Sequence, residues 1–232
     1  MLDGVLFDLD DTLYDYAPCN ESALQTVFDR FGHDFSLGGA QFRKLHDQVR
    51  RELAEELHGQ APAHNRLLFF KRMVERQTGR SVVPLATEMF ELYWNTFLEN
   101  MRPAADAHAV LRELCASMPL ALVSNHTTDI QLRKVARLGF ESYFQVIVTS
   151  EEVGAEKPSA APFLAALTAL KIEPAQALMV GDDPGADIRG AAAVGIHTVL
   201  TSEFARGAID SSEAERVVTE LAELPGIVAA FS

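Results

Sequence analysis

Acidic side chains follow the first apolar run of the chain, where they could bind a cation or take part in covalent chemistry. The run 4–7 leads directly into Asp8, Asp10 and Asp11. Residues two apart in an extended segment point to the same side, so Asp8 and Asp10 would repel unless a cation neutralises them or one carries a proton. A hard divalent ion with oxygen ligands, most simply Mg²⁺, meets this requirement. A helix start capped by Asp10 or Asp11 accounts for the same acids when the stretch is taken alone.

Further polar side chains follow later apolar runs. Ser124 and Asn125 come after the run 120–123 and offer a hydroxyl and an amide beside a helix start, a setting that suits phosphate oxygens. Lys157 supplies a positive charge in an acidic protein. Three acids follow the run 177–180: Asp182, Asp183 and Asp187. Each cluster alone has an ordinary reading as a helix cap, a solvated lysine or a turn, but open α/β sheets bind ligands at the carboxyl ends of strands, so together they predict one site.

The composition is that of a globular protein with an acidic balance. The chain has 232 residues, of which 48% are hydrophobic and 23% charged, enough to build a core in one or two domains. The formal net charge is −13, which argues against a nucleic-acid or anionic-membrane partner. A small anionic substrate would need local positive groups.

Cysteine usage and the start of the chain indicate an ordinary intracellular protein. Cys19 and Cys115 lie far apart and form neither a disulfide framework nor a zinc-binding pattern. The first residues lack the basic stretch of a signal peptide, and no segment reaches the length that spans a membrane. We expect a cytoplasmic location.

Between residues 15 and 101 the apolar residues recur at helical spacing. Four amphipathic helices are predicted, with apolar stripes over 24–31, 42–57, 67–74 and 86–97. They indicate a small helical bundle whose aromatic residues form its core.

From residue 103 onward, predicted helices alternate with predicted strands. The strands are expected at 120–123, 146–148, 177–180 and 196–200, and the helices at 110–115, 130–138, 163–170 and 188–194. A short strand at 217–218 and a helix near Ile227 follow. This alternation predicts an α/β fold, a doubly wound Rossmann-like parallel sheet to which the first strand also belongs. The helical bundle is then an insertion, with residues 1–14 and 102–232 forming the α/β core and residues 15–101 a separate helical domain.

The ordered motifs resemble those of the haloacid dehalogenase superfamily. The stretch Asp-Leu-Asp-Asp-Thr from Asp8 to Thr12 resembles its first motif, Ser124 its second, Lys157 its third, and the run 181–187 its fourth. The helical insertion resembles the C1 cap of that superfamily. The second Asp together with Thr12 resembles its phosphatase branch.

The resemblance implies an Mg²⁺-dependent hydrolysis of small phosphate esters. Asp8 would be the nucleophile that forms an aspartyl-phosphate, and Asp10 the acid and base for the leaving group and water. Mg²⁺ would be held by the carboxylates of Asp8 and Asp182 and the backbone carbonyl of Asp10. The phosphoryl oxygens would be bound by Ser124, Asn125 and Lys157, with Thr12, Asp183 and Asp187 in supporting roles. A monomer or a homodimer is expected.

Some positions depart from the family pattern. His126 stands where relatives often have Gly, and Asp183 where Ser or Asn is frequent. The polar segment 58–66, with His64 and Arg66, could reach over the site and read a further substrate group, or be an ordinary helix connection.

Three alternatives to the phosphatase remain. A 2-haloacid dehalogenase would share the Asp8 nucleophile and cleave a carbon–halogen bond without metal. A phosphosugar mutase would retain the phosphoryl group on a sugar. A non-enzymatic phospho-acceptor module would be stably phosphorylated without turnover, but it has no need of a cap.

Overall fold

The structure is a computed structural model that describes residues 2–231. Its described residues divide into two compact units, one made of residues 2–15 and 102–231 and the other of residues 16–101. The functional assignment of these ranges as catalytic core and cap stays a prediction.

The larger unit is built on a six-stranded parallel sheet. The strands are β1 (Gly4–Phe7), β2 (Leu120–Ser124), β3 (Val146–Thr149), β4 (Ala177–Gly181), β5 (His197–Thr201) and β6 (Arg216–Val218). Their order is β3-β2-β1-β4-β5-β6, and every pairing is parallel. In this register Leu6 of β1 is aligned with Ala121 of β2 and Met179 of β4. The predicted doubly wound α/β fold is confirmed.

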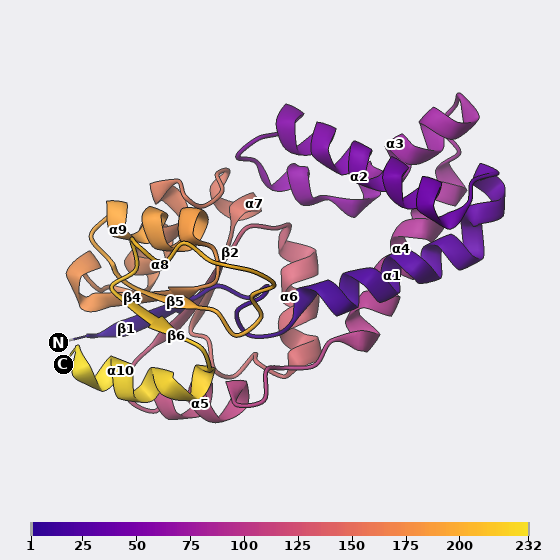
Figure 1. Ribbon diagram of the computed structural model, residues 1–232. Helices are drawn as coiled ribbons and strands as arrows, with labels where there is room; N and C mark the ends of the chain where they lie inside the picture. The colour runs from indigo at the N-terminus through magenta and orange to yellow at the C-terminus, as the bar shows by residue number, and fades with distance from the viewer. Residues whose placement is uncertain (1, 232) are drawn as a thin grey trace. The chain divides into compact units, whose positions relative to one another are not determined.

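Helices cover both faces of the sheet, which is why its strands are apolar throughout. The helices are α5 (Ala107–Cys115), α6 (Thr128–Leu138), α7 (Ser150–Val153), α8 (Ala160–Leu170), α9 (Gly190–Ala193) and α10 (Leu224–Ala230). Figure 1 shows α8 and α9 on one face and α5 and α10 on the other. On the first face Leu6 and Met179 of the sheet pack in one apolar cluster with Phe163 of α8.

Two local features differ from the sequence prediction. The helix expected at 188–194 is preceded by a π-helical turn, Pro184–Arg189, and continues as α9 only to Ala193. The short helix α7, four residues long, was not predicted because one turn is too short to show a period.

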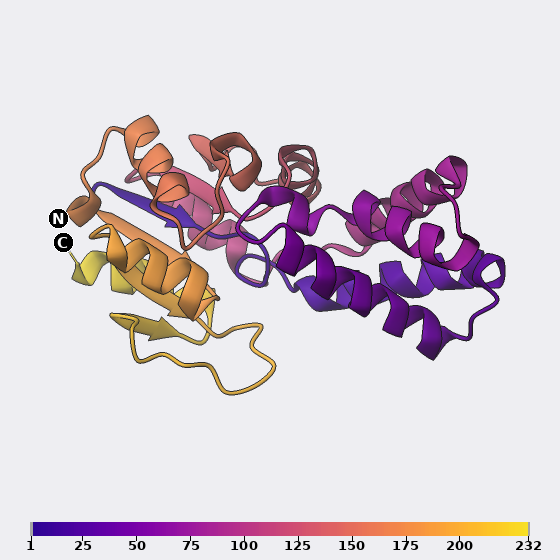
Figure 2. The same cartoon turned by 90° about the horizontal axis from the view of Figure 1, so that it is seen from above.

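The smaller unit contains four long helices. They are α1 (Tyr16–Phe31), α2 (Gly39–Glu56), α3 (Arg66–Thr78) and α4 (Val83–Asn100). Helix α4 packs against α1 and α3, and α3 packs against α2 (Figure 2). Phe70, Trp94 and Phe97 are fully buried, so the aromatic residues form the core of this unit as predicted. Among residues 2–231, no helix is both long and apolar enough to cross a membrane.

Candidate active site

The strand order places the first and fourth motifs side by side. β1 lies between β2 and β4. After β1, the chain forms β2 and β3 on one side of β1 and then crosses to form β4 on its other side. Asp8 follows β1, and Asp182 follows β4. The backbone N–H of Asp8 donates to the carbonyl of Val180 at 2.9 Å, so the two strand ends are fixed together. Ligands bind to doubly wound sheets at this switch point.

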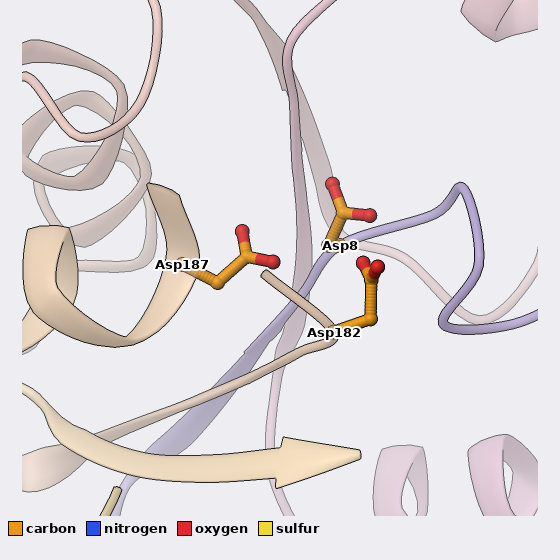
Figure 3. A group of neighbouring side chains, drawn as sticks. All are labelled: Asp8, Asp182 and Asp187. Carbon is orange, nitrogen blue, oxygen red and sulfur yellow. The ribbon is translucent and has the colours of Figure 1, made fainter. Parts of the chain in front are cut away.

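Three carboxylates meet at this position. One oxygen from each of Asp8, Asp182 and Asp187 lies within 4.8 Å of the others (Figure 3). Asp187 comes from the π-helical turn, and the N–H of Asp183 donates to its Oδ2 at 3.0 Å. A Cβ at Gly181 would lie 2.3 Å from that Oδ2, so only glycine leaves room for this carboxylate. Asp187 is thus a member of the carboxylate cluster, whereas the sequence led us to expect only a supporting role.

Lys157 lies between two of these acids. Its Nζ donates to Oδ1 of Asp8 and Oδ1 of Asp187, both at 2.6 Å, and to the carbonyl of Val123 at 2.7 Å. All three N–H bonds of the ammonium are therefore used within the protein. Burial alone would lower the pKa of Lys157, but the charges of Asp187 and Asp8 raise it above its ordinary value. The side chain remains a buried cation.

Ser124 and Asn125 have different hydrogen-bond partners. The side chain of Asn125 donates to the carbonyl of Lys157 at 2.9 Å and accepts from its backbone N–H at 2.7 Å. These two bonds support the Lys157 backbone, and the phosphate contact of Asn125 stays a prediction. Ser124 is buried and accepts a hydrogen bond from Gln131 Nε2.

The supporting residues of the first and fourth motifs are also placed. The hydroxyl of Thr12 donates to Asp182 at 3.4 Å. Asp183 caps the π-helical turn, because its Oδ1 accepts from the N–H groups of Gly185 at 2.7 Å and Ala186 at 2.9 Å. These bonds explain why an acid at position 183 is tolerated beside the carboxylate cluster.

The carboxylate of Asp10 is outside the three-carboxylate cluster. Lys134 Nζ donates to both of its oxygens at 2.8 Å, and the hydroxyl of Tyr14 donates to Oδ1. The alternative of a capped helix start is wrong, since α1 begins only at Tyr16 and Asp11 has a left-handed φ of 56°.

His126 and Arg66 each have local partners. His126 is buried, and its Nδ1 accepts from the N–H of Thr127 at 2.8 Å. Arg66 is buried in the helical unit, where it donates to the His64 carbonyl at 2.8 Å and to the hydroxyl of Tyr16. These contacts hold both side chains in the packed interior, and a role of either residue toward a substrate stays a prediction.

Comparison with known proteins identifies the family. The family model described as haloacid dehalogenase-like hydrolase matches residues 5–201. The chain belongs to this family. The hydrolase is 38% identical over 240 residues to the ribulose-1,5-bisphosphate 5-phosphatase of Halopiger xanaduensis, a match covering 98% of this chain and 100% of that protein. It is 31% identical over 204 residues to the glyceraldehyde 3-phosphate phosphatase of Methanopyrus kandleri, covering 86% and 83% of the two chains.

Solved structures agree with this assignment. The 2-haloacid dehalogenase from Pseudomonas syringae pv. Tomato DC3000 superposes with a TM-score of 0.78 at 26% identity, over 100% of both chains. The expected superfamily is therefore confirmed, while the C1 type of the cap stays a prediction.

The acids of the hydrolase fit a hard divalent cation. Burial raises the pKa of Asp8 to about 7, with the charge of Lys157 opposing this effect and that of Asp187 adding to it. Burial and the charges of Asp8 and Asp187 raise the pKa of Asp182 to about 9. A bound cation would relieve the repulsion between these carboxylates. Carboxylate oxygens are also the ligands that Mg²⁺ prefers.

Mg²⁺ is expected to stabilise the hydrolase more at alkaline than at mildly acidic pH. The folded protein keeps protons on Asp8 and Asp182 up to a pH of about 7 and about 9, whereas the unfolded chain loses them near 3.8. The unfolding free energy of the metal-free protein therefore falls as the pH rises through this window, because the folded state binds more protons. Mg²⁺ competes with those protons, so we expect the thermal midpoint to rise by roughly 5 °C at about pH 8.5 and by less at about pH 6.

Two variants control this measurement. Asp182→Asn removes one carboxylate of the cluster and should cancel most of the Mg²⁺-dependent shift. Asp29→Asn changes an exposed acid of α1 and should keep it. An equal shift at both pH values, or an undiminished one in Asp182→Asn, would contradict the metal assignment.

A pocket adjoins the acidic cluster of the hydrolase. It has a volume of about 430 Å³ and is lined by residues that include Asp11, Asp182, Thr201 and Arg206. Arg206 pairs with Asp15 and lies 3.7 Å from Asp11.

Sequence reasoning missed three residues around the site: Tyr14, Gln131 and Lys134. A signal for Lys134 was available, because Ile130, Lys134 and Leu138 are four residues apart and share the buried side of α6. Gln131 shares this signal, because the buried Val135 and Leu138 follow it at spacings of four and seven residues. Tyr14 carried no comparable signal.

Proposed function

We propose that the hydrolase is an Mg²⁺-dependent phosphatase that cleaves small phosphorylated metabolites through an aspartyl-phosphate on Asp8. Its family and its relatives place it among the phosphoric monoester hydrolases. The observation that carries the proposal is the buried Lys157 between Asp8 and Asp187, beside Asp182, at the switch point of the sheet. This arrangement offers a nucleophile together with positive charge for an anionic substrate.

In the first step, a carboxylate oxygen of Asp8 attacks phosphorus. The bond between phosphorus and the ester oxygen breaks, and Asp10, protonated by the attacking water of the preceding turnover, gives this proton to the leaving oxygen. Lys157 offsets the repulsion between Asp8 and the substrate, and the hydroxyl of Ser124 donates a hydrogen bond to a phosphoryl oxygen. Direct contact between Lys157 and a phosphoryl oxygen requires one of its three present bonds to be given up.

In the second step, water attacks the aspartyl-phosphate. Asp10 now takes a proton from the water, the bond between Asp8 and phosphorus breaks, and inorganic phosphate is released. In this structure Asp10 accepts hydrogen bonds from Lys134 and Tyr14, the acceptor arrangement that this step needs.

Asp8, Asp182 and Asp187 would hold Mg²⁺, together with the predicted carbonyl of Asp10. When bound, the ion supplies positive charge that neutralises the carboxylates and the phosphoryl oxygens. Thr12 and Asp183 would orient Asp182 and Asp187 through the bonds described above.

A phosphorylated sugar is the substrate class that we propose. The relative over the full chain length is named for a pentose bisphosphate, and a second relative for a triose phosphate. The pocket next to Asp182 gives such a substrate room beside the acids.

Replacing Asp10 with Asn should slow turnover according to the leaving group. An alkyl phosphate needs protonation of its leaving oxygen, so kcat should fall by about 10³-fold or more, while an aryl phosphate should lose less. Steady-state kinetics on both esters measures the difference. Equal losses on both would show that Asp10 has only a structural role.

The proposed function is tested by a panel of phosphorylated metabolites assayed with and without Mg²⁺. Pentose bisphosphates, triose phosphates, nucleotides and phosphoglycolate cover the main classes. Phosphate release that depends on Mg²⁺ is the expected result. Release of halide from a 2-haloacid in the presence of EDTA, with no phosphate release from any ester, would favour the dehalogenase instead.

A further inference from the structure

Helix α6 carries two polar side chains that are fully buried, Gln131 and Lys134. Each has a relative exposure of 0%. They are three residues apart, so they project from neighbouring positions on one side of the helix. A buried ammonium or amide is costly unless it is bonded, and each of these residues reaches a different motif of the proposed site.

Lys134 reaches the first motif. Its Nζ lies 2.8 Å from both oxygens of Asp10 and 5.9 Å from the centre of the Tyr14 ring. The Tyr14 hydroxyl donates to the same carboxylate, and Tyr14 is itself fully buried. Donors on two side chains therefore fix the direction of the ionised Asp10 carboxylate, the form that acts as a base in the second step.

Gln131 reaches the second motif. Its Nε2 donates to the Oγ of Ser124. A hydroxyl has a single proton, so when its oxygen accepts from Gln131 its own proton is left to donate elsewhere. This bond thus orients Ser124 as a donor, the form that binds a phosphoryl oxygen.

Stability alone does not account for the buried Lys134–Asp10 pair. Replacing a buried ion pair by apolar residues of similar volume is often neutral or stabilising. The stability of the protein therefore does not by itself require this pair on α6.

We propose that Lys134 and Gln131 are positioning residues of the phosphatase site. Lys134 orients Asp10 as the base that takes a proton from water, and Gln131 orients the Ser124 hydroxyl toward the phosphoryl group. The inference rests on the proposed function and assigns α6 the task of aligning two motifs that are far apart in the sequence.

The test for Lys134 is the amount of phosphoenzyme during turnover of an aryl phosphate. In Lys134→Met, kcat should fall by about 10-fold to 100-fold, and the fraction of enzyme trapped as aspartyl-phosphate by acid quench should rise, because breakdown slows more than formation. Lys134→Arg keeps a donor and should recover part of kcat. Arg133→Met, an exposed change on the same helix, is the matched control and should behave as wild type.

Two further variants separate positioning from folding. Tyr14→Phe removes only the hydroxyl that donates to Asp10 and should shift the phosphoenzyme level in the same direction. The double variant Asp10→Asn with Lys134→Met should be no slower than Asp10→Asn alone, since Lys134 acts through Asp10. Two results would overturn the proposal for Lys134. One is a loss of kcat in the double variant equal to the product of the two single losses, and the other is a lower kcat in Lys134→Met without more phosphoenzyme.

Gln131 is tested with inorganic phosphate as a competitive inhibitor. Gln131→Met should weaken phosphate binding by about 3-fold to 10-fold, with no further loss when combined with Ser124→Ala. Unchanged inhibition in Gln131→Met would overturn this part. A wild-type protein without any phosphatase activity would instead refute the proposed function, so the two failures are distinct.

Discussion

Replacing Asp8 with Asn is expected to reduce phosphate release by at least about 10⁴-fold while the fold is retained, because the amide cannot form the acyl phosphate. The amide oxygen has nearly the shape of the carboxylate and can still accept from Lys157. The change also removes one of three clustered acids, so the thermal midpoint should be equal to or above that of the wild type at about pH 8.

The matched control for this variant is Asp3→Asn. Asp3 is an exposed acid just before β1, and its replacement should leave turnover unchanged. Both proteins are compared by phosphate release from an aryl phosphate and by thermal unfolding. Turnover in Asp8→Asn within tenfold of wild type would sink the nucleophile assignment.

Replacing Lys157 with Met should damage both activity and stability. The ammonium separates the buried carboxylates of Asp8 and Asp187, and removing one partner of a buried ion pair costs about 3–5 kcal/mol of unfolding free energy. We expect kcat/KM to fall by about 10²-fold to 10⁴-fold, because the charge that offsets the substrate's repulsion is lost. Urea denaturation and steady-state kinetics measure the two effects.

Two further variants serve as controls for this result, Lys157→Arg and Lys71→Met. An arginine keeps the charge, but its planar guanidinium does not reproduce three bonds from one nitrogen, so stability should recover more than activity. Lys71 forms an exposed ion pair with Glu75, and its loss should cost less than about 0.5 kcal/mol. If Lys157→Met keeps activity within about threefold, Lys157 has no electrostatic role in catalysis.

The fold could be predicted from the sequence because apolar strands and amphipathic helices leave local patterns that recur along the chain. Strands buried on both faces are apolar throughout, and the helices between them show clear periods, so both the parallel sheet and the helical insertion were predicted. The π-helical turn Pro184–Arg189 was not, since nothing in its pattern separates it from an α-helix. It matters for the site, because this turn brings Asp187 against Gly181.

The sequence predicted individual side chains of the site, but not the contacts between them. Four residues were identified because each follows an apolar strand or belongs to a motif found in the expected order: Asp8, Ser124, Lys157 and Asp182. The ion pair of Lys134 with Asp10 joins residues 124 positions apart, and only the packing of α6 against the first motif creates it. The spacing of Lys134 with Ile130 and Leu138 could indicate its buried position, although a lysine is ordinarily solvated. No spacing indicates that its partner is Asp10.

Acid-quench mass spectrometry of the protein during turnover tests the central claim most directly. The hydrolase is mixed with an aryl phosphate and Mg²⁺, quenched in acid, digested and searched for a phosphoryl group on the peptide that contains Asp8. We predict a phosphorylated Asp8 that forms and decays at rates consistent with turnover and is absent in Asp8→Asn. Steady phosphate release with no phosphoryl group on Asp8, or with one on another residue, would contradict the account.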